Sequence, residues 1–175
     1  MNKINLTEVF CEVMSGLALL ITIIPLLDIL KYSNLCDTIS YISLNISLSN
    51  FGILIVVCYI LGLLFDAIGL TIGELFLDNL VYKNLPSENE IKSFWQKITP
   101  HVLNYRDTQW AYYSCYRNLF IIFIPGTFLW TIVLWNSLHW YLGFLILIMF
   151  IILEFIFYFS MKVLLKIYYE ITKSF

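Results

Sequence analysis

Residues 118–153 read NLFIIFIPGTFLWTIVLWNSLHWYLGFLILIMFIIL, and this stretch decides the fold because it contains no aspartate, glutamate, lysine or arginine. One bilayer crossing takes about 20 apolar residues, so a run of this length predicts two membrane-spanning helices. The polar pair Asn136-Ser137 interrupts the run, with a tryptophan on each side as expected of interfacial aromatics. We therefore expect a helical hairpin whose spans cover residues 119–135 and about 140–161.

The composition of the whole chain places it in a membrane. Of its 175 residues, 61% are hydrophobic and 13% are charged, whereas a soluble domain is about half apolar and a quarter charged. Because so few polar side chains cannot cover a surface that faces water, lipid must be the main solvent. We expect an all-α polytopic membrane protein, formed as a single membrane domain of residues 1–175, with membrane lipid as a partner.

Two further apolar segments precede the hairpin and bring the expected number of transmembrane helices to four. The first covers about residues 8–30 and the second about residues 51–82. At about 1.5 Å per residue, the second helix is longer than the roughly 30 Å of hydrocarbon in a bilayer. Its last turns should therefore stand in water before Pro86 ends the helix.

The positive charges predict the orientation. Nine of the ten lysine and arginine residues lie before the first span, between the second and third, or after the fourth, and only Lys31 lies on the other side. Loops rich in lysine and arginine stay in the cytoplasm. The N and C termini and the segment 83–118 are therefore expected to be cytoplasmic.

The segment 83–118 is the only sizeable polar stretch, and it is predicted to form a short cytoplasmic helical segment. Ser87 followed three residues later by Glu90 has the pattern of a capping box, which begins a helix. Pro100 should end that helix. A second helix should begin near Asp107 and continue into the third span.

Two uses of this segment stay open. It either lies on the inner headgroups as an amphipathic helix, or it forms a basic, aromatic-lined pocket for a cytosolic nucleotide or oligonucleotide. A protein regulator would contact the same residues. The candidate residues for such a cytosolic ligand or partner are Lys83, Lys92, Trp95, Lys97, Arg106 and Trp110.

Charged residues inside the spans are the usual markers of function, because each is unfavourable in lipid unless it forms an ion pair or contacts water. Helix rise places one such group from every span near the inner leaflet, about 21 to 27 Å below the outer edge. These groups are Glu12, Asp66, Arg117 and Glu154. Arg117 is expected near Asp66 or Glu154, since an unpaired cation at that depth is unfavourable.

Hydroxyl groups add to a polar stripe on the first helix, and this stripe would line a pore if several copies of the chain met around an axis. In the alternative interpretation, the hydroxyl groups of serine and threonine donate hydrogen bonds to the backbone carbonyls of the preceding helical turn and play no part in a pore. The candidate pore residues with hydroxyl groups are Ser15 and Thr22 on the first helix and Thr127 and Thr131 on the third.

Four helices of a single chain are too thin to enclose a pore, so a channel requires a homo-oligomer, for which we predict a tetramer. Gly62, Gly69 and Gly73 fall on one side of the second helix. Small residues let another helix approach closely. This face is the predicted surface for helix packing in the oligomer.

Signatures of catalysis are missing from the sequence. It contains no H-E-x-x-H, no G-x-S-x-G and no phosphate-binding glycine loop. The four cysteines are far apart and form no C-x-x-C pair, so neither a zinc site nor a redox dithiol is predicted. We expect a protein that is not an enzyme and that uses no metal and no cofactor.

Two short stretches resemble a known group of proteins. Residues 59–69, YILGLLFDAIG, are similar to a Y-x-L-G-x-x-x-D-x-x-G pattern, and residues 113–118, YSCYRN, are similar to an aromatic-x-x-x-R-N pattern. Both occur in small bacterial four-span membrane proteins, some of which resemble membrane components of Hailong-type and Kiwa-type antiphage defence systems. The resemblance implies a channel or membrane-disrupting effector in the bacterial inner (plasma) membrane, held closed by a cytosolic ligand or partner.

The predicted function is therefore an oligomeric ion channel or pore-type membrane effector. The alternative is a non-conducting membrane sensor or scaffold subunit that recruits a cytosolic partner protein. Ion selectivity stays open, because the acids of the inner belt favour cations whereas the basic loop would concentrate anions.

Overall fold

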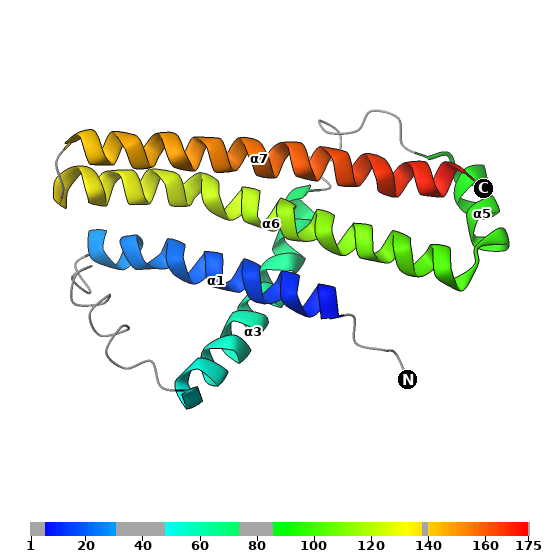
Figure 1. Ribbon diagram of the computed structural model, residues 1–175, viewed down its shortest axis with the longest axis horizontal. Helices are drawn as coiled ribbons and strands as arrows, with labels where there is room; N and C mark the ends of the chain where they lie inside the picture. Colours follow the sequence, from blue (N-terminus) through cyan, green and yellow to red (C-terminus); the bar gives the residue numbers. More distant parts are fainter. Residues whose placement is uncertain (1–5, 31–47, 74–85, 138–139, 175) are drawn as a thin grey trace.

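The computed structural model describes residues 6–30, 48–73, 86–137 and 140–174. Within these ranges the chain is almost entirely helical (Figure 1). The helices are α1 (Leu6–Ile29), α3 (Leu48–Ile72), α5 (Glu88–Lys97), α6 (Pro100–Ser137) and α7 (Trp140–Lys173).

Four of these helices are long and apolar enough to cross a membrane, as the sequence predicts. The apolar segments that qualify are Leu6–Ile29, Phe51–Ile72, Pro100–Trp135 and Gly143–Lys173. The protein is thus an all-helical, multi-pass membrane protein. The predicted extension of the second span over residues 74–82 lies outside the described residues, as does Lys83.

Three of the long helices run roughly along one another, and the fourth crosses them (Figure 1). α6 and α7 form the predicted hairpin, α1 packs alongside α6, and α3 lies obliquely against both α1 and α6. α5 lies across the end of the bundle against α7. The start of α1, the start of α6 and the end of α7 therefore lie toward the same end as α5.

The start of α6 differs from the prediction. The helix begins at Pro100 rather than near Asp107, and α5 has already ended at Lys97. The first helix of this segment thus ends before Pro100 as predicted, and the start of the second helix, which was expected near Asp107, was wrong. Proline is well suited to the first helical turn, because the N–H group that it lacks would have no partner within the helix there.

The end of α7 differs as well. The span was expected to end near Met161, where lysines begin, but the helix continues to Lys173. Lysine is a good helix former, and residues 162–173 contain no glycine or proline. The lysines therefore do not end the helix. With 34 residues α7 is about 51 Å long, well beyond the roughly 30 Å of hydrocarbon.

Glycines bring α1 and α3 into contact backbone to backbone. A Cβ atom added at Gly62 would overlap the backbone oxygen of Glu12, and one added at Gly16 would overlap the backbone oxygen of Cys58. Such close approach is what small residues permit between membrane helices. The crossing of α1 and α3 therefore depends on the absence of a side chain at both positions.

The predicted small-residue face of the second span packs inside one chain. Gly62 meets α1, whereas Gly69 and Gly73 meet side chains of α6. The close helix contact expected of this face is present, but its assignment to an oligomer interface was wrong. The reason is that α1 and α6 of the same chain already cover it.

We predict that Gly62→Ala destabilises the bundle by roughly 1 to 3 kcal/mol, the usual range for overpacking, because the new methyl group forces α1 and α3 apart. Gly52→Ala is the matched control on the same helix, since a Cβ atom there meets nothing within 4 Å. The free energy of unfolding, measured by denaturing-detergent titration of the purified variants, checks this. Equal stability of the two variants would contradict the backbone contact.

Candidate functional site

A buried ion pair joins α3 to α6. The Arg117 side chain is 1% exposed, and its Nη2 atom lies 2.8 Å from Oδ1 of Asp66. This confirms that Arg117 lies near one of the two predicted acids, and it selects Asp66 over Glu154. The pairing has a clear physical reason, because a guanidinium buried without an anion is strongly destabilising.

Neighbouring side chains of α6 complete the network around the Asp66 carboxylate. Oδ1 of Asp66 also accepts hydrogen bonds from the hydroxyl of Ser114 and from Nδ2 of Asn118, the latter at 2.9 Å. Arg117 Nη2 donates to Ser114 Oγ at 2.9 Å. Ser114, Arg117 and Asn118 share one face of α6 by their i, i+3, i+4 spacing, so a single face of this helix supplies all three donors.

Two glycines of α3 make room for these side chains. A Cβ atom at Gly69 would overlap Oδ1 of Asn118, and one at Gly73 would lie 2.7 Å from Cδ of Arg117. The glycine face of α3, which was predicted to pack against another helix, thus contacts a network of polar side chains. The two stretches that carry the resemblance meet at this point, one contributing Asp66 and the other Arg117.

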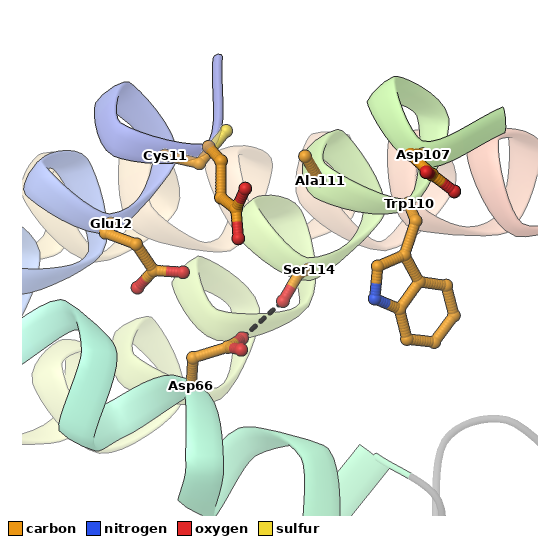
Figure 2. A pocket seen from close by; sticks show the side chains of 8 residues that line it. Cys11, Glu12, Asp66, Asp107, Trp110, Ala111 and Ser114 are labelled. Atoms are coloured by element: carbon orange, nitrogen blue, oxygen red, sulfur yellow. Dashed lines mark hydrogen bonds between the residues drawn. The ribbon is translucent and has the colours of Figure 1, made fainter. Parts of the chain in front are cut away.

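A cavity of about 280 Å³ opens beside the ion pair, between α1, α3 and α6 (Figure 2). In Figure 2 the side chains of Glu12 and Asp66 reach into the space between these helices from α1 and α3. Ser114 and Trp110 extend into it from α6. The residues that line the cavity are Glu8, Cys11, Glu12, Asp66, Asp107, Trp110, Ala111 and Ser114.

The negative charges of this cavity outnumber the positive charges that compensate them. Four of its lining residues are acidic and none is basic. Asp66 is paired with Arg117, and Asp107 is paired with Arg106 at 3.1 Å. No ion pair joins Glu8 or Glu12 to another of the described residues. The cavity therefore contains two acidic groups without a basic partner among the described residues.

Glu12 is the most unusual of these groups. It is 6% exposed, and its Oε2 atom is buried with no hydrogen-bond partner among the residues that the structure describes. A buried carboxylate oxygen without a donor is strongly unfavourable. Oε2 of Glu12 is thus the one buried side-chain nitrogen or oxygen of the described residues that has no hydrogen-bond partner.

The hydroxyl residues predicted to line a pore satisfy themselves within the chain. Ser15 Oγ donates to the carbonyl of Cys11 at 3.0 Å, and Thr22 Oγ1 donates to that of Ala18 at 2.9 Å. Thr131 Oγ1 donates to the carbonyl of Thr127 at 2.6 Å. These are the bonds to the preceding turn that the alternative interpretation expected.

Glu154 lies apart from the other three intramembrane charges. Its Oε1 atom is 2.6 Å from Thr127 Oγ1, which belongs to α6 ten residues beyond Arg117. Ten residues of helix correspond to about 15 Å. The expectation that all four charges share one inner belt was therefore wrong for Glu154, because the hairpin sets it opposite Thr127.

The region around α5 is held by aromatic side chains. Phe94 of α5 is fully buried, and the guanidinium carbon of Arg106 lies 4.7 Å from its ring centre and 4.8 Å from that of Trp95. These distances are within the range of cation–π attraction. Arg106 therefore attaches α5 to α6, and Tyr168 of α7 lies on the same guanidinium at 5.3 Å.

The capping box at the start of α5 is confirmed. The backbone N–H of Ser87 donates to Oε2 of Glu90 at 2.6 Å, and the backbone N–H of Glu90 lies 3.3 Å from the hydroxyl of Ser87. The hydrogen bonds that Ser87 donates, first from its backbone and then from its side chain, lower the pKa of Glu90. They contribute stability above the ordinary pKa of glutamate, and this contribution is lost as the pH falls through the lowered pKa.

The candidate residues for a cytosolic ligand are divided between different places. Trp110 lines the cavity, and Arg106 is buried in the attachment of α5. Trp95 is 55% exposed on α5, where Lys92 and Lys97 are exposed too. Arg106 and Trp95 thus lie together in one groove, whereas Trp110 lines a separate cavity.

Several residues of the site escaped the sequence prediction. Asp107 lines the cavity, and Ser114 and Asn118 bind Asp66, whereas Glu8 was already part of the polar stripe predicted on the first helix. The i, i+3, i+4 spacing of Ser114, Arg117 and Asn118 was a readable signal of one polar helix face. The spacing did not identify Asp66 as the partner of this face, because α3 is far from α6 along the sequence.

The described residues offer no site for a directly bound metal ion: no three or more histidine, cysteine, aspartate or glutamate side chains converge on one point there. The cysteines of this part of the chain, Cys11, Cys58 and Cys115, are free thiols. Comparison of the chain with protein-family models, with curated protein sequences and with solved structures gives no match.

We predict that Asp66→Asn lowers the free energy of unfolding by about 3 to 5 kcal/mol, because it leaves the buried guanidinium of Arg117 without its anion. Glu170→Gln is a matched control, since it removes one acid from the exposed pair of Lys166 and Glu170, whose atoms are 3.6 Å apart. An exposed pair contributes little. An equal loss of unfolding free energy in both variants would show that the buried pair of Arg117 and Asp66 stabilises the protein no more than an exposed pair does.

Proposed function

We propose that this protein is the subunit of a cation-conducting membrane channel, and that the cavity between α1, α3 and α6 belongs to the path of the ion. The observation that carries the proposal is the buried carboxyl group of Glu12, which no positive charge of the described residues compensates. Fixed carboxylates raise the local concentration of cations and exclude anions. These acids support the proposal of a cation-selective path.

Conduction by this protein requires several copies. The four spans of one chain pack on one another, and the cavity is bounded by only three of them. Much of α3 and α7 faces outward with large apolar side chains, which offers surface both to lipid and to neighbouring copies. We propose a homo-oligomer, with a tetramer as the first assembly to test.

The setting of the channel is part of the proposal. The lysine and arginine distribution supports a cytoplasmic location for both ends of the chain. The resemblance of the stretches around Asp66 and Arg117 to bacterial antiphage membrane proteins supports the bacterial inner membrane and a defence role. A cytosolic ligand or partner would then act on the end of the bundle that carries α5 and the mouth of the cavity.

Purified protein in planar bilayers is expected to conduct K⁺ in preference to Cl⁻. Glu12→Gln should lower the K⁺ conductance by about tenfold, the low end of the effect that a charged cleft has on the local ion concentration, because it removes a fixed negative charge from the cavity. Glu88→Gln is the matched control, because Glu88 is exposed on α5, away from the cavity.

Two results would overturn the channel. One is a silent bilayer with verified incorporation of the protein, in the presence and absence of cytosolic extract. The other is conduction that Glu12→Gln leaves unchanged.

A non-conducting sensor or scaffold subunit is the second candidate, and one observation favours it. A groove of about 320 Å³ lies where α5 meets α6 and α7, and Trp95 and Ile91 at its edge are both exposed. Exposed aromatic side chains are typical anchors of protein partners. A chain that is harmless when expressed alone, silent in bilayers, and bound to a cytosolic protein that Trp95→Ala releases would establish this function instead.

A further inference from the structure

We propose that the cavity between α1, α3 and α6 binds a primary ammonium group, which donates a hydrogen bond to Glu12 and lies against Trp110. The inference rests on the proposed function in taking this cavity as the cation site, and it names the class of cation. The chemistry is that of a small aliphatic amine. It has two sources, a free amine from the cytosol and the ethanolamine headgroup of a lipid.

Charge is the first argument. Arg117 and Arg106 offset Asp66 and Asp107, which leaves Glu8 and Glu12 as the uncompensated acids of the cavity. Glu8 is exposed, so water stabilises it, whereas Glu12 is enclosed. A bound monovalent cation would remove the strongest electrostatic penalty in the site.

The need for a hydrogen-bond donor is the second argument. Oε2 of Glu12 is buried without a partner. The terminal torsion of a glutamate side chain is broad, so the carboxylate turns easily toward a ligand in the cavity. An ammonium group donates N–H bonds to such an oxygen, whereas a quaternary ammonium or an alkali ion has no hydrogen to donate.

Size and shape are the third argument. A volume of about 280 Å³ is several times the roughly 30 Å³ that one water molecule occupies in the liquid. The described acids do not converge as direct ligands of a metal ion. The space therefore suits a cation with an apolar body of a few carbon atoms.

Trp110 supplies the apolar wall for such a body. The indole lines the cavity and packs on Tyr113 and Tyr168, whose ring centres are 5.2 Å and 4.9 Å away. Tryptophan is the best of the aromatic side chains for attracting a cation to its ring face. Carboxylates and a fixed indole together distinguish an organic ammonium group from a hydrated alkali ion.

The test uses the full chain in nanodiscs of phosphatidylcholine and phosphatidylglycerol, which contain no primary amine. Ethylammonium, tetramethylammonium and potassium chlorides are titrated at equal ionic strength, and the unfolding midpoint and tryptophan fluorescence are followed. We expect ethylammonium to raise the midpoint saturably and the other two cations to leave it unchanged. This comparison is made on the unaltered protein, so it does not depend on the folding of any variant.

Variants then locate the binding. Glu12→Gln should weaken ethylammonium binding by about tenfold or more, as expected for loss of a hydrogen bond to a charged group, and Trp110→Leu should weaken it severalfold. Glu88→Gln should bind as the unaltered protein does. Equal effects of tetramethylammonium or potassium, or unchanged affinity in Glu12→Gln, would overturn the proposal.

The source of the ammonium group is resolved by changing the lipid. If nanodiscs with phosphatidylethanolamine lower the apparent affinity for ethylammonium, the headgroup competes for the same site and the lipid is the source. An unchanged affinity assigns the site to a free amine. Amine binding without conductance would refute the channel alone, and conductance without amine binding would refute this inference alone.

Discussion

The ion pair of Arg117 and Asp66 is the interaction on which the arrangement of the four long helices depends. It joins α3 to α6 inside the bundle, where neither charge would be tolerated alone. Ser114 and Asn118 reinforce it, and two glycines of α3 provide the space that it occupies. An oblique helix with little other contact to α6 is thereby held in one register.

The same pair determines the character of the cavity. Arg117 is the only base among the intramembrane charges that the sequence singles out, and its guanidinium binds Asp66. Glu12, on the facing helix, is left without a positive partner in the described part of the chain. We propose that a cation compensates the second of these neighbouring acids. This asymmetry is the basis of both the proposed conduction and the proposed ammonium site.

The sequence was informative about elements and less so about their partners. Uncharged runs and positive-charge counts predicted four helices, and the unfavourable burial of a lone cation predicted a partner for Arg117. Periodicity cannot show which element covers a helix face, so Gly69 and Gly73 were assigned to another copy of the chain when they face α6. The depth of Glu154 was misjudged because residue counts assume parallel, equally placed helices. The cavity was invisible in the sequence, since its lining comes from three helices that are far apart along the chain.

A double-mutant cycle on Asp66→Asn and Arg117→Gln tests the central claim most directly, because it isolates the coupling between the two side chains from their other contacts. We predict a coupling free energy above about 1.5 kcal/mol, within the range measured for side chains in direct contact. The double variant should then be much more stable than the sum of the two single losses implies. Single effects that add to within about 0.5 kcal/mol would contradict the claim that this pair organises the bundle.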